Sequence, residues 1–244
     1  MRVFRGFDSL PAFRHAAVTT GSFDGVHRGH CKLLECVQRE AQMRGGESVV
    51  LTPEPHPRIF FGDSGIKLLT TLAEKIALLE QAGVDNLVVM PFDAGFSRLT
   101  AREFIARHIV GEIGAEHLTV GYNNRFGHDR QGGAEFLAAV SREFGLQVEE
   151  AARYDAEGEQ VSSTMIRRAV GEGQMQRAAR LAGHPYIIIG MARGGVVEGV
   201  PGYKLLPPDG EYDARVGGEG CKVRIAGGKL LLNTRIEGLV TITL

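Results

Sequence analysis

Short apolar runs alternate with stretches of helical periodicity from the start of the chain to about residue 185. Runs such as Val49-Val50-Leu51 and Leu87–Met90 contain no polar position, as expected for strands of a parallel sheet that are buried on both faces. The pattern predicts strands over 16–22, 48–52, 86–90, 117–121 and 147–150. It predicts helices over 28–43, 72–82, 101–111, 133–144, 163–172 and 174–182. This alternation is typical of a doubly wound, Rossmann-like α/β domain, which binds ligands at the carboxyl ends of its strands.

The pattern changes after Pro185. Residues 186–244 are rich in glycine and lack helical periodicity, and turn signals such as Pro208-Asp209-Gly210 and Ala226-Gly227-Gly228 separate their apolar runs. We therefore predict two domains, an α/β domain over 1–185 and a small all-β module over 186–244. A module of this size is near the lower limit for an independent core, so we expect it to depend on the larger domain.

Composition narrows the classes of partner. Lys and Arg total 28 against 29 Asp and Glu, and this net charge of −1 gives no bulk attraction to nucleic acid or to an anionic membrane. No apolar run reaches the roughly 18 residues of a membrane span, and the first residues lack the apolar segment of a secretory signal. Three cysteines are typical of free thiols in a reducing compartment. We expect a cytoplasmic protein without nucleic-acid or membrane partners.

A glycine-rich turn with two histidines follows the first buried strand. Residues 20–30 join that strand to a helix, where unpaired backbone N–H groups and the helix dipole favour a bound phosphate. The imidazoles of His27 and His30 can donate hydrogen bonds to phosphate oxygens. Ordinary turn histidines and a zinc pair are the alternatives, although no cluster of further metal ligands is evident. His27-Arg28-Gly29-His30 resembles the H-x-G-H signature of the nucleotidylyltransferase superfamily.

Five segments, in this order, are similar to one family across nearly all of residues 15–200. The segments are 21–30, 54–58 (EPHPR), 69–75 (LTTLAEK), 121–130 (GYNNRFGHDR) and 161–167 (VSSTMIR). They resemble the adenylyltransferase domain of the bacterial bifunctional riboflavin kinase/FMN adenylyltransferases, or prokaryotic FAD synthetases. The resemblance implies that AMP is transferred from MgATP to FMN, giving FAD and pyrophosphate. FMN and ATP would be the substrates, and Mg²⁺ would accompany the ATP.

The resemblance also implies roles for individual residues. Catalytic contacts to the ATP phosphates would come from His27, His30, Ser163, Thr164 and Arg167. Contacts to FMN or to the nucleotide would come from Gly21, Phe23, Asp24, Gly25, Gly29, Pro55, His56, Pro57, Arg58, Asn123, Arg125, Arg130 and Ser162. No protein metal site is implied.

Several of these residues also have a purely structural interpretation. The hydroxyls of residues 162–164 can cap the helix that follows them, and this is compatible with phosphate binding because both use the same N–H groups. Pro55 and Pro57 predict an extended backbone, which can simply be a rigid loop. Asp24 is better explained as a turn residue before Gly25 than as a magnesium ligand. Asn124 departs from the family, which usually has an aromatic residue at that position.

The C-terminal module departs furthest from the family. The kinase barrel of the family carries a G-R-x-L-G-F-P-T-A-N run that serves MgATP. In this chain, residues 195–207 (GVVEGVPGYKLLP) lack that run. We therefore expect a shortened remnant of the barrel without riboflavin kinase activity. The alternatives are a chain that keeps both activities and a non-catalytic flavin or nucleotide sensor. Transferases for pantetheine or nicotinate nucleotides share H-x-G-H, but segments 55–58 and 121–130 argue against them.

Overall fold

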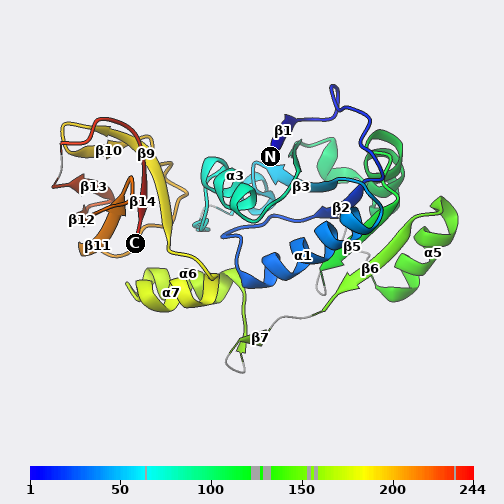
Figure 1. Ribbon diagram of the computed structural model, residues 1–244. Helices are drawn as coiled ribbons and strands as arrows, with labels where there is room; N and C mark the ends of the chain where they lie inside the picture. Colours follow the sequence, from blue (N-terminus) through cyan, green and yellow to red (C-terminus); the bar gives the residue numbers. More distant parts are fainter. Residues whose placement is uncertain (64, 122–126, 129–132, 153–154, 157–158, 234) are drawn as a thin grey trace. The chain divides into compact units, whose positions relative to one another are not determined.

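A computed structural model describes residues 1–63, 65–121, 127–128, 133–152, 155–156, 159–233 and 235–244 (Figure 1). The chain forms two compact units. The first unit comprises Met1–Phe23, Gly29–Ser64 and Leu79–Tyr154, and the second comprises Asp24–Arg28, Gly65–Leu78 and Asp155–Leu244. These compact units are not the two predicted domains, and the predicted domain boundary after residue 185 stays a prediction.

The first unit is built on a six-stranded parallel sheet with the order β1-β4-β3-β2-β5-β6. Its strands are β1 (Arg2–Arg5), β2 (Ala17–Thr20), β3 (Ser48–Glu54), β4 (Asn86–Pro91), β5 (His117–Gly121) and β6 (Gln147–Ala151). The predicted doubly wound α/β class is confirmed. The pattern missed β1, an edge strand of four residues with an arginine at each end, which pairs in parallel with β4.

Helices cover both faces of this sheet. The helical segments of this unit are α1 (Arg28–Met43), α2 (Pro57–Phe60), the 3₁₀ turn η1 (Phe96–Arg98), α4 (Ala101–Phe104), the π-helical η2 (Ile105–Glu112) and α5 (Ala134–Phe144), of which α1, η2 and α5 supply buried residues to the two faces. Ala17 of β2 packs against Val37 and Ala41 of α1, while the next residue, Val18, belongs to a core that contains Ile109 of η2 and Leu137 of α5. This alternation along the strand buries β2 on both faces.

The predicted helix over 101–111 begins where expected and changes type along its length. Thr100 and Glu103 form the capping box that the Thr-x-x-Glu pattern indicates, because each side chain accepts a hydrogen bond from the other residue's backbone N–H. The chain leaves the α-helical form after Phe104 and continues as η2 to Glu112. The start of the helix could therefore be predicted, whereas its change of hydrogen bonding could not.

The second unit contains the hairpin β7 (Asp155–Ala156) and β8 (Glu159–Gln160), helices α6 (Ser163–Gly171) and α7 (Met175–Ala182), and a closed antiparallel barrel. Helix α3 (Leu72–Gln81) begins in this unit. The barrel strands are β9 (Ile187–Arg193), β10 (Val196–Glu198), β11 (Gly210–Val216), β12 (Glu219–Ala226), β13 (Lys229–Leu232) and β14 (Gly238–Thr243). The all-β module is confirmed.

Closure leaves the barrel no unpaired edge strand, because its order β10-β13-β12-β11-β14-β9 returns to β10. Apolar side chains at alternate positions, such as Val223 and Ile225 of β12, are buried. Across the described ranges, no helix combines the length and the apolar character that crossing a membrane would need.

Candidate active site

A cavity in the first unit lies where the strand order of the sheet reverses. From β2, the next strands β3 and β4 lie on one side, and β5 and β6 lie on the other. In such sheets the carboxyl ends of the strands at the reversal form a crevice for ligands. The cavity has a volume of about 420 Å³ and is lined by Gly21 after β2, Met90 of β4 and Pro57 of α2. Its position and volume are those of a small-molecule site.

Aromatic rings form one side of this cavity. The ring centroids of Phe61 and Phe92 are 5.9 Å apart, and those of Phe92 and Phe96 are 5.7 Å apart. Phe104 continues the series with its centroid 5.7 Å from that of Phe96. All four line the cavity. Edge and tilted contacts of this kind hold the rings in place and offer a planar aromatic ligand both faces and edges to pack on.

None of these four phenylalanines was among the predicted site residues. Phe92 follows the carboxyl end of β4, so the strand-end rule applied to Met90-Pro91-Phe92 would have found it. Phe61 ends the run that begins at Pro55-His56-Pro57. Phe96 and Phe104 carried no signal, because only the folding of η1 and α4 toward β4 makes them line the cavity.

The turn after β2 contributes two of the predicted residues. Gly21 lines the cavity, and a Cβ there would lie 3.2 Å from the ring of Phe23. Phe23 is buried, with a φ of 46° that is unfavourable for a residue other than glycine. Its ring centroid is 5.2 Å from that of His30, in the first turn of α1 together with Gly29. Phe23 therefore packs within the turn and supports His30.

The Pro-His-Pro-Arg segment forms a helical turn and not the extended loop that its prolines suggest. Pro57 is the first residue of α2, and the buried His56 caps it, with Nδ1 accepting a hydrogen bond from the Arg58 backbone N–H at 3.2 Å. Pro55 is exposed. Arg58 is also exposed and pairs with Asp63 at 2.6 Å. Within this segment, only Pro57 is among the residues that line the cavity.

The carboxylate of Asp24 holds together three segments of the second unit. Oδ1 accepts hydrogen bonds from the backbone N–H and the hydroxyl of Thr70, at 3.0 and 3.1 Å. Oδ2 accepts from the Leu69 N–H at 3.1 Å and from Arg167 Nη2 at 2.6 Å. Asp24 is buried, so these donors compensate for the loss of water. The carboxylate is thus an anchor for the turn.

The two residues after Asp24 have backbone conformations that the turn requires. Gly25 has a φ of 84°, and a Cβ there would lie 2.7 Å from Leu69 Cδ1, so a larger residue would both strain the backbone and clash. Val26 has a φ of 37°, which is rare for a β-branched side chain. Such strain is typical of functional turns that their surroundings hold in place.

Helix α6 carries three of the predicted residues: Ser162 caps its first turn, and Ser163 and Arg167 contact Asp24. Ser162 caps the helix by accepting a hydrogen bond from the Met165 N–H, and the hydroxyl of Ser163 donates to the Asp24 carbonyl oxygen at 2.9 Å. Arg167 donates from Nε to the Lys67 carbonyl oxygen at 2.9 Å as well as from Nη2 to Asp24. Thr164 is exposed. We call Asp24, His27, Ser163, Arg167 and the segment 67–70 the polar cluster.

His27 is buried within the second unit, and burial lowers its pKa from 6.5 to about 4. The Asp24 carboxylate and a hydrogen bond to the residue's own backbone act in the opposite direction, and His184 and Arg167 lower the pKa further. The imidazole is therefore neutral at pH 7. It can donate a hydrogen bond to a phosphate oxygen but brings no positive charge, whereas Arg167 brings the positive charge that pairs with Asp24.

Asn123, Arg125 and Arg130 lie outside the described residues, so their predicted contacts stay predictions. Among the other predicted residues, the structure brings Asp24, Gly25, His27, Ser162, Ser163 and Arg167 together in the second unit. Gly21, Phe23, His30 and Pro57 belong to the first unit.

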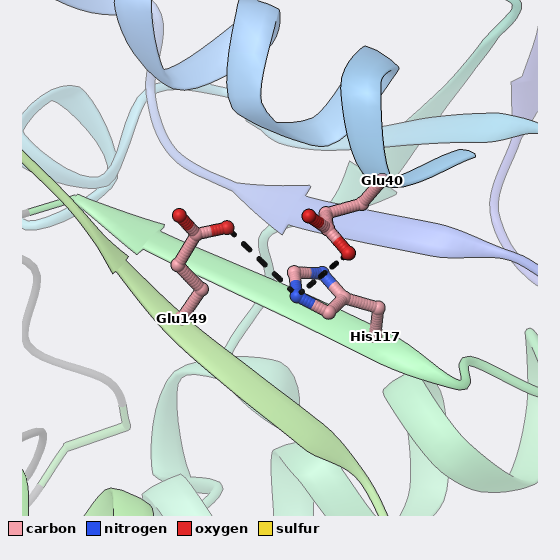
Figure 2. A group of neighbouring side chains, drawn as sticks. All are labelled: Glu40, His117 and Glu149. Atoms are coloured by element: carbon pink, nitrogen blue, oxygen red, sulfur yellow. Dashed lines mark ion pairs between the residues drawn. The ribbon is translucent and has the colours of Figure 1, made fainter. Parts of the chain in front are cut away.

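A group of polar side chains in the first unit was not predicted. Figure 2 shows that Glu40 of α1, His117 of β5 and Glu149 of β6 converge, with His117 Nε2 lying 3.6 Å from Glu40 and 3.9 Å from Glu149. A histidine and two carboxylates can bind a divalent metal. However, Arg39 Nη2 lies 3.0 Å from both oxygens of Glu149, and Arg44 lies 3.5 Å from Glu40. Because two guanidinium groups already balance the two carboxylates, we interpret this group as a charge network.

Comparison with known proteins agrees with this architecture. The model of the FAD synthetase family matches residues 10–165. The bifunctional riboflavin kinase/FMN adenylyltransferase of Pseudomonas fluorescens is 37% identical over 191 residues, covering 78% of this chain and 61% of that protein. The protein of the same name from Escherichia coli (strain K12) is 35% identical over 193 residues, covering 78% and 62%. The chain thus spans about three fifths of the length of these curated relatives.

One solved structure is similar along the whole chain. The crystal structure described as a macrolide-efflux protein from Streptococcus pneumoniae has a TM-score of 0.81 and 23% identity, and the match covers 100% of this chain and 89% of that one. At this identity the likeness shows the fold alone. The match of the family model over residues 10–165, which include strands β2 to β6 and the turn after β2, shows that the chain belongs to the FAD synthetase family.

Proposed function

We propose that the chain is an FMN adenylyltransferase, which transfers AMP from MgATP to FMN and releases FAD and pyrophosphate. Membership of the FAD synthetase family supports this reaction. The observation that carries the proposal is the cavity of about 420 Å³ at the reversal of the strand order, with its four phenylalanines. It offers a planar aromatic ring an apolar site that has Gly21 and Ser22, after β2, in its lining.

In this proposal the isoalloxazine ring of FMN occupies the cavity. Phe61, Phe92 and Phe96 would pack on the ring, and the edge contacts between them would fix its orientation. Gly21 would allow the backbone to approach the ligand closely, because it has no side chain. Binding here is driven mainly by burial of apolar surface.

The polar cluster would act on the phosphates of ATP. An oxygen of the FMN phosphate forms a bond to the α-phosphorus, the bond from that phosphorus to the oxygen bridging to the β-phosphorus breaks, and pyrophosphate leaves with the electron pair. The neutral His27 would donate a hydrogen bond to a phosphate oxygen, and Arg167 would supply positive charge. Within the second unit, Ser163 and Thr164 would contribute further donors. Contacts from His30 and from the first N–H groups of α1 are what the resemblance implies.

The magnesium ion would enter with ATP as part of the substrate. The two carboxylate oxygens of Asp24 already accept four hydrogen bonds, so this residue is poorly suited to serve as a metal ligand. Mg²⁺ commonly keeps several waters and binds to substrate phosphates. The protein would then orient the phosphates and leave the ion to them.

We also propose that the chain does not phosphorylate riboflavin, because the run of residues 195–207 lacks the nucleotide-binding sequence of the family's kinase barrel. The cytoplasmic location and the lack of a nucleic-acid partner stay predictions.

The test is chromatographic separation of flavins after purified protein is incubated with MgATP and either FMN or riboflavin. FAD from FMN, with no FMN from riboflavin, is the expected result. FMN formed from riboflavin would show that the chain keeps both activities. Tight flavin binding without any product would contradict the enzyme and favour a sensor.

A further inference from the structure

Lys204 is a fully buried cation in the second unit, far along the chain from the predicted site residues. Its ammonium lies 2.9 Å from Glu74 Oε2, and neither side chain is exposed to solvent. It also donates to the carbonyl oxygens of Leu69 and Ile187, at 2.6 and 2.7 Å, and lies 4.2 Å from the centroid of the Tyr186 ring. Burying an ion pair is costly, so a site with this many partners favours one defined arrangement.

Glu74 joins the start of α3 to the barrel. Its carboxylate accepts hydrogen bonds from the Thr71 N–H at 2.7 Å, which completes a capping box, and from the Ile189 N–H of β9 at 2.9 Å. Residues 69–75 resemble the family in sequence, yet the polar cluster accounts only for Leu69 and Thr70. The role of Glu74 is therefore to hold this segment to the C-terminal module.

The backbone next to Lys204 strengthens the same connection. The Leu68 N–H donates to the Tyr203 carbonyl oxygen at 2.7 Å, and the Leu205 N–H donates to the Leu68 carbonyl oxygen at 2.8 Å. Residue 204 and Leu68 thus pair as in a parallel sheet. Lys204 fixes the segment through both its backbone neighbours and its ammonium.

From Leu69 the connection continues to the polar cluster. Lys204 binds the carbonyl of Leu69, whose N–H binds the carboxylate of Asp24. Thr70 binds the same carboxylate, and its hydroxyl also accepts from the Gly25 N–H at 3.1 Å. The carboxylate in turn holds Arg167. Three successive polar contacts therefore lead from Lys204 through Leu69 and Asp24 to Arg167.

We propose that Lys204 is a positioning residue for adenylyl transfer, which fixes the Asp24 turn and Arg167 through Leu69 and Thr70. The C-terminal module then has a task in the reaction even without kinase activity, since it supplies the ammonium and, at Ile189, a donor to Glu74. The kinetic tests of this proposal rest on the proposed function. Affinity for MgATP is a further readout that does not depend on turnover.

The test compares Lys204→Met with wild-type full-length protein. We expect at least a tenfold fall in kcat, a several-fold rise in KM for ATP and at least a fivefold loss of MgATP affinity by calorimetry. KM for FMN should change less than twofold, because the flavin cavity belongs to the first unit. Lys222→Met is the matched control. This lysine is also in the barrel, but it is half exposed and paired with Asp213 at the surface, so its removal should leave all four quantities unchanged.

Lys204→Met leaves Glu74 buried without its partner, so the double variant Glu74→Gln/Lys204→Met provides a second test. It removes both charges together and still lacks the donor to Leu69, so the same changes in kcat and KM for ATP are expected. Folded variants with wild-type KM and affinity for ATP would overturn the proposal, as would a fall in rate that only follows the folded fraction. Wild-type protein that binds MgATP but forms no FAD would instead overturn the proposed function.

Discussion

The cavity of the first unit and the polar cluster of the second unit are built from opposite kinds of contact. The cavity is lined mainly by rings and other apolar groups, and its members touch through ring edges. In the polar cluster, hydrogen bonds and an ion pair tie Asp24 to Leu69, Thr70 and Arg167. Apolar packing loses strength gradually as groups are removed, whereas a buried charge without its partner is severely destabilising. The two regions should therefore respond very differently to single substitutions.

The largest effect is expected at the anchor of the polar cluster. Asp24→Asn should destabilise the fold by about 3 kcal/mol, because it leaves Arg167, whose side chain is only 20% exposed, without its ion pair. Urea unfolding followed by circular dichroism measures the change. Asp63→Asn, which breaks the exposed pair with Arg58, is the control and should cost less than about 1 kcal/mol. Equal losses in the two variants would contradict the anchoring role.

A large effect on turnover is expected at His27. His27→Asn should lower kcat for FAD formation by about 100-fold, because it removes a donor that stabilises the negative charge of the transition state. His15→Asn, at an exposed histidine paired with Glu116, is the matched control and should keep the wild-type rate. If the two variants differ only in stability, His27 is a structural residue of the turn.

The low pKa of His27 gives a pH dependence with a defined sign. The unfolded chain takes up a proton near pH 6.5 and the folded protein only near pH 4, so the unfolded state binds more protons between these values. Stability is thus full above about pH 6.5 and falls as the pH drops, by about 2 kcal/mol between pH 7 and pH 5. Urea unfolding at pH 7 and at pH 5, in wild type and in His27→Asn, measures how much of this loss of stability His27 causes. An identical pH dependence in the two proteins would show that His27 is not its source.

The smallest effect is expected in the cavity. Phe92→Ala should raise KM for FMN about tenfold and leave kcat nearly unchanged, because packing on the flavin is the same in the ground state and in the transition state. Phe144→Ala, in α5, removes a half-buried ring that is not among the cavity's lining residues and should leave KM for FMN unchanged. A cavity that does not bind FMN would give equal KM values in both variants.

The same contrast explains what could be predicted from the sequence. The periodicity of hydrophobic positions and the capping residues located most helices and strands, and the apolar runs at 49–51 and 87–90 indicated a parallel sheet. These features could be predicted because they depend on residues that are close together in the chain. The H-x-G-H turn and the 161–167 segment identified the family for the same reason. The phenylalanines of the cavity come from β4, η1, α4 and the residues after α2, and no motif links them.

Other features followed from contacts between distant residues. Lys204 stands alone in Tyr-Lys-Leu-Leu, and only the fold brings it to Glu74 and Leu69. Pro55 and Pro57 suggested an extended loop, whereas His56 and Pro57 start a helical turn. The sequence therefore indicated the family's chemistry, and the structure was needed to show what supports the residues thought to perform it.

The most direct test of adenylyl transfer follows radioactive phosphorus from ATP into the flavin product. Wild-type protein is incubated with FMN and either [α-³²P]ATP or [γ-³²P]ATP, and the flavins are separated and counted. Adenylyl transfer predicts that α-label enters FAD in an amount equal to the FAD formed, and that the γ-label released from ATP appears in pyrophosphate and in no flavin. Absence of α-label from the flavin would contradict adenylyl transfer, and γ-label in a flavin product would show phosphoryl transfer instead.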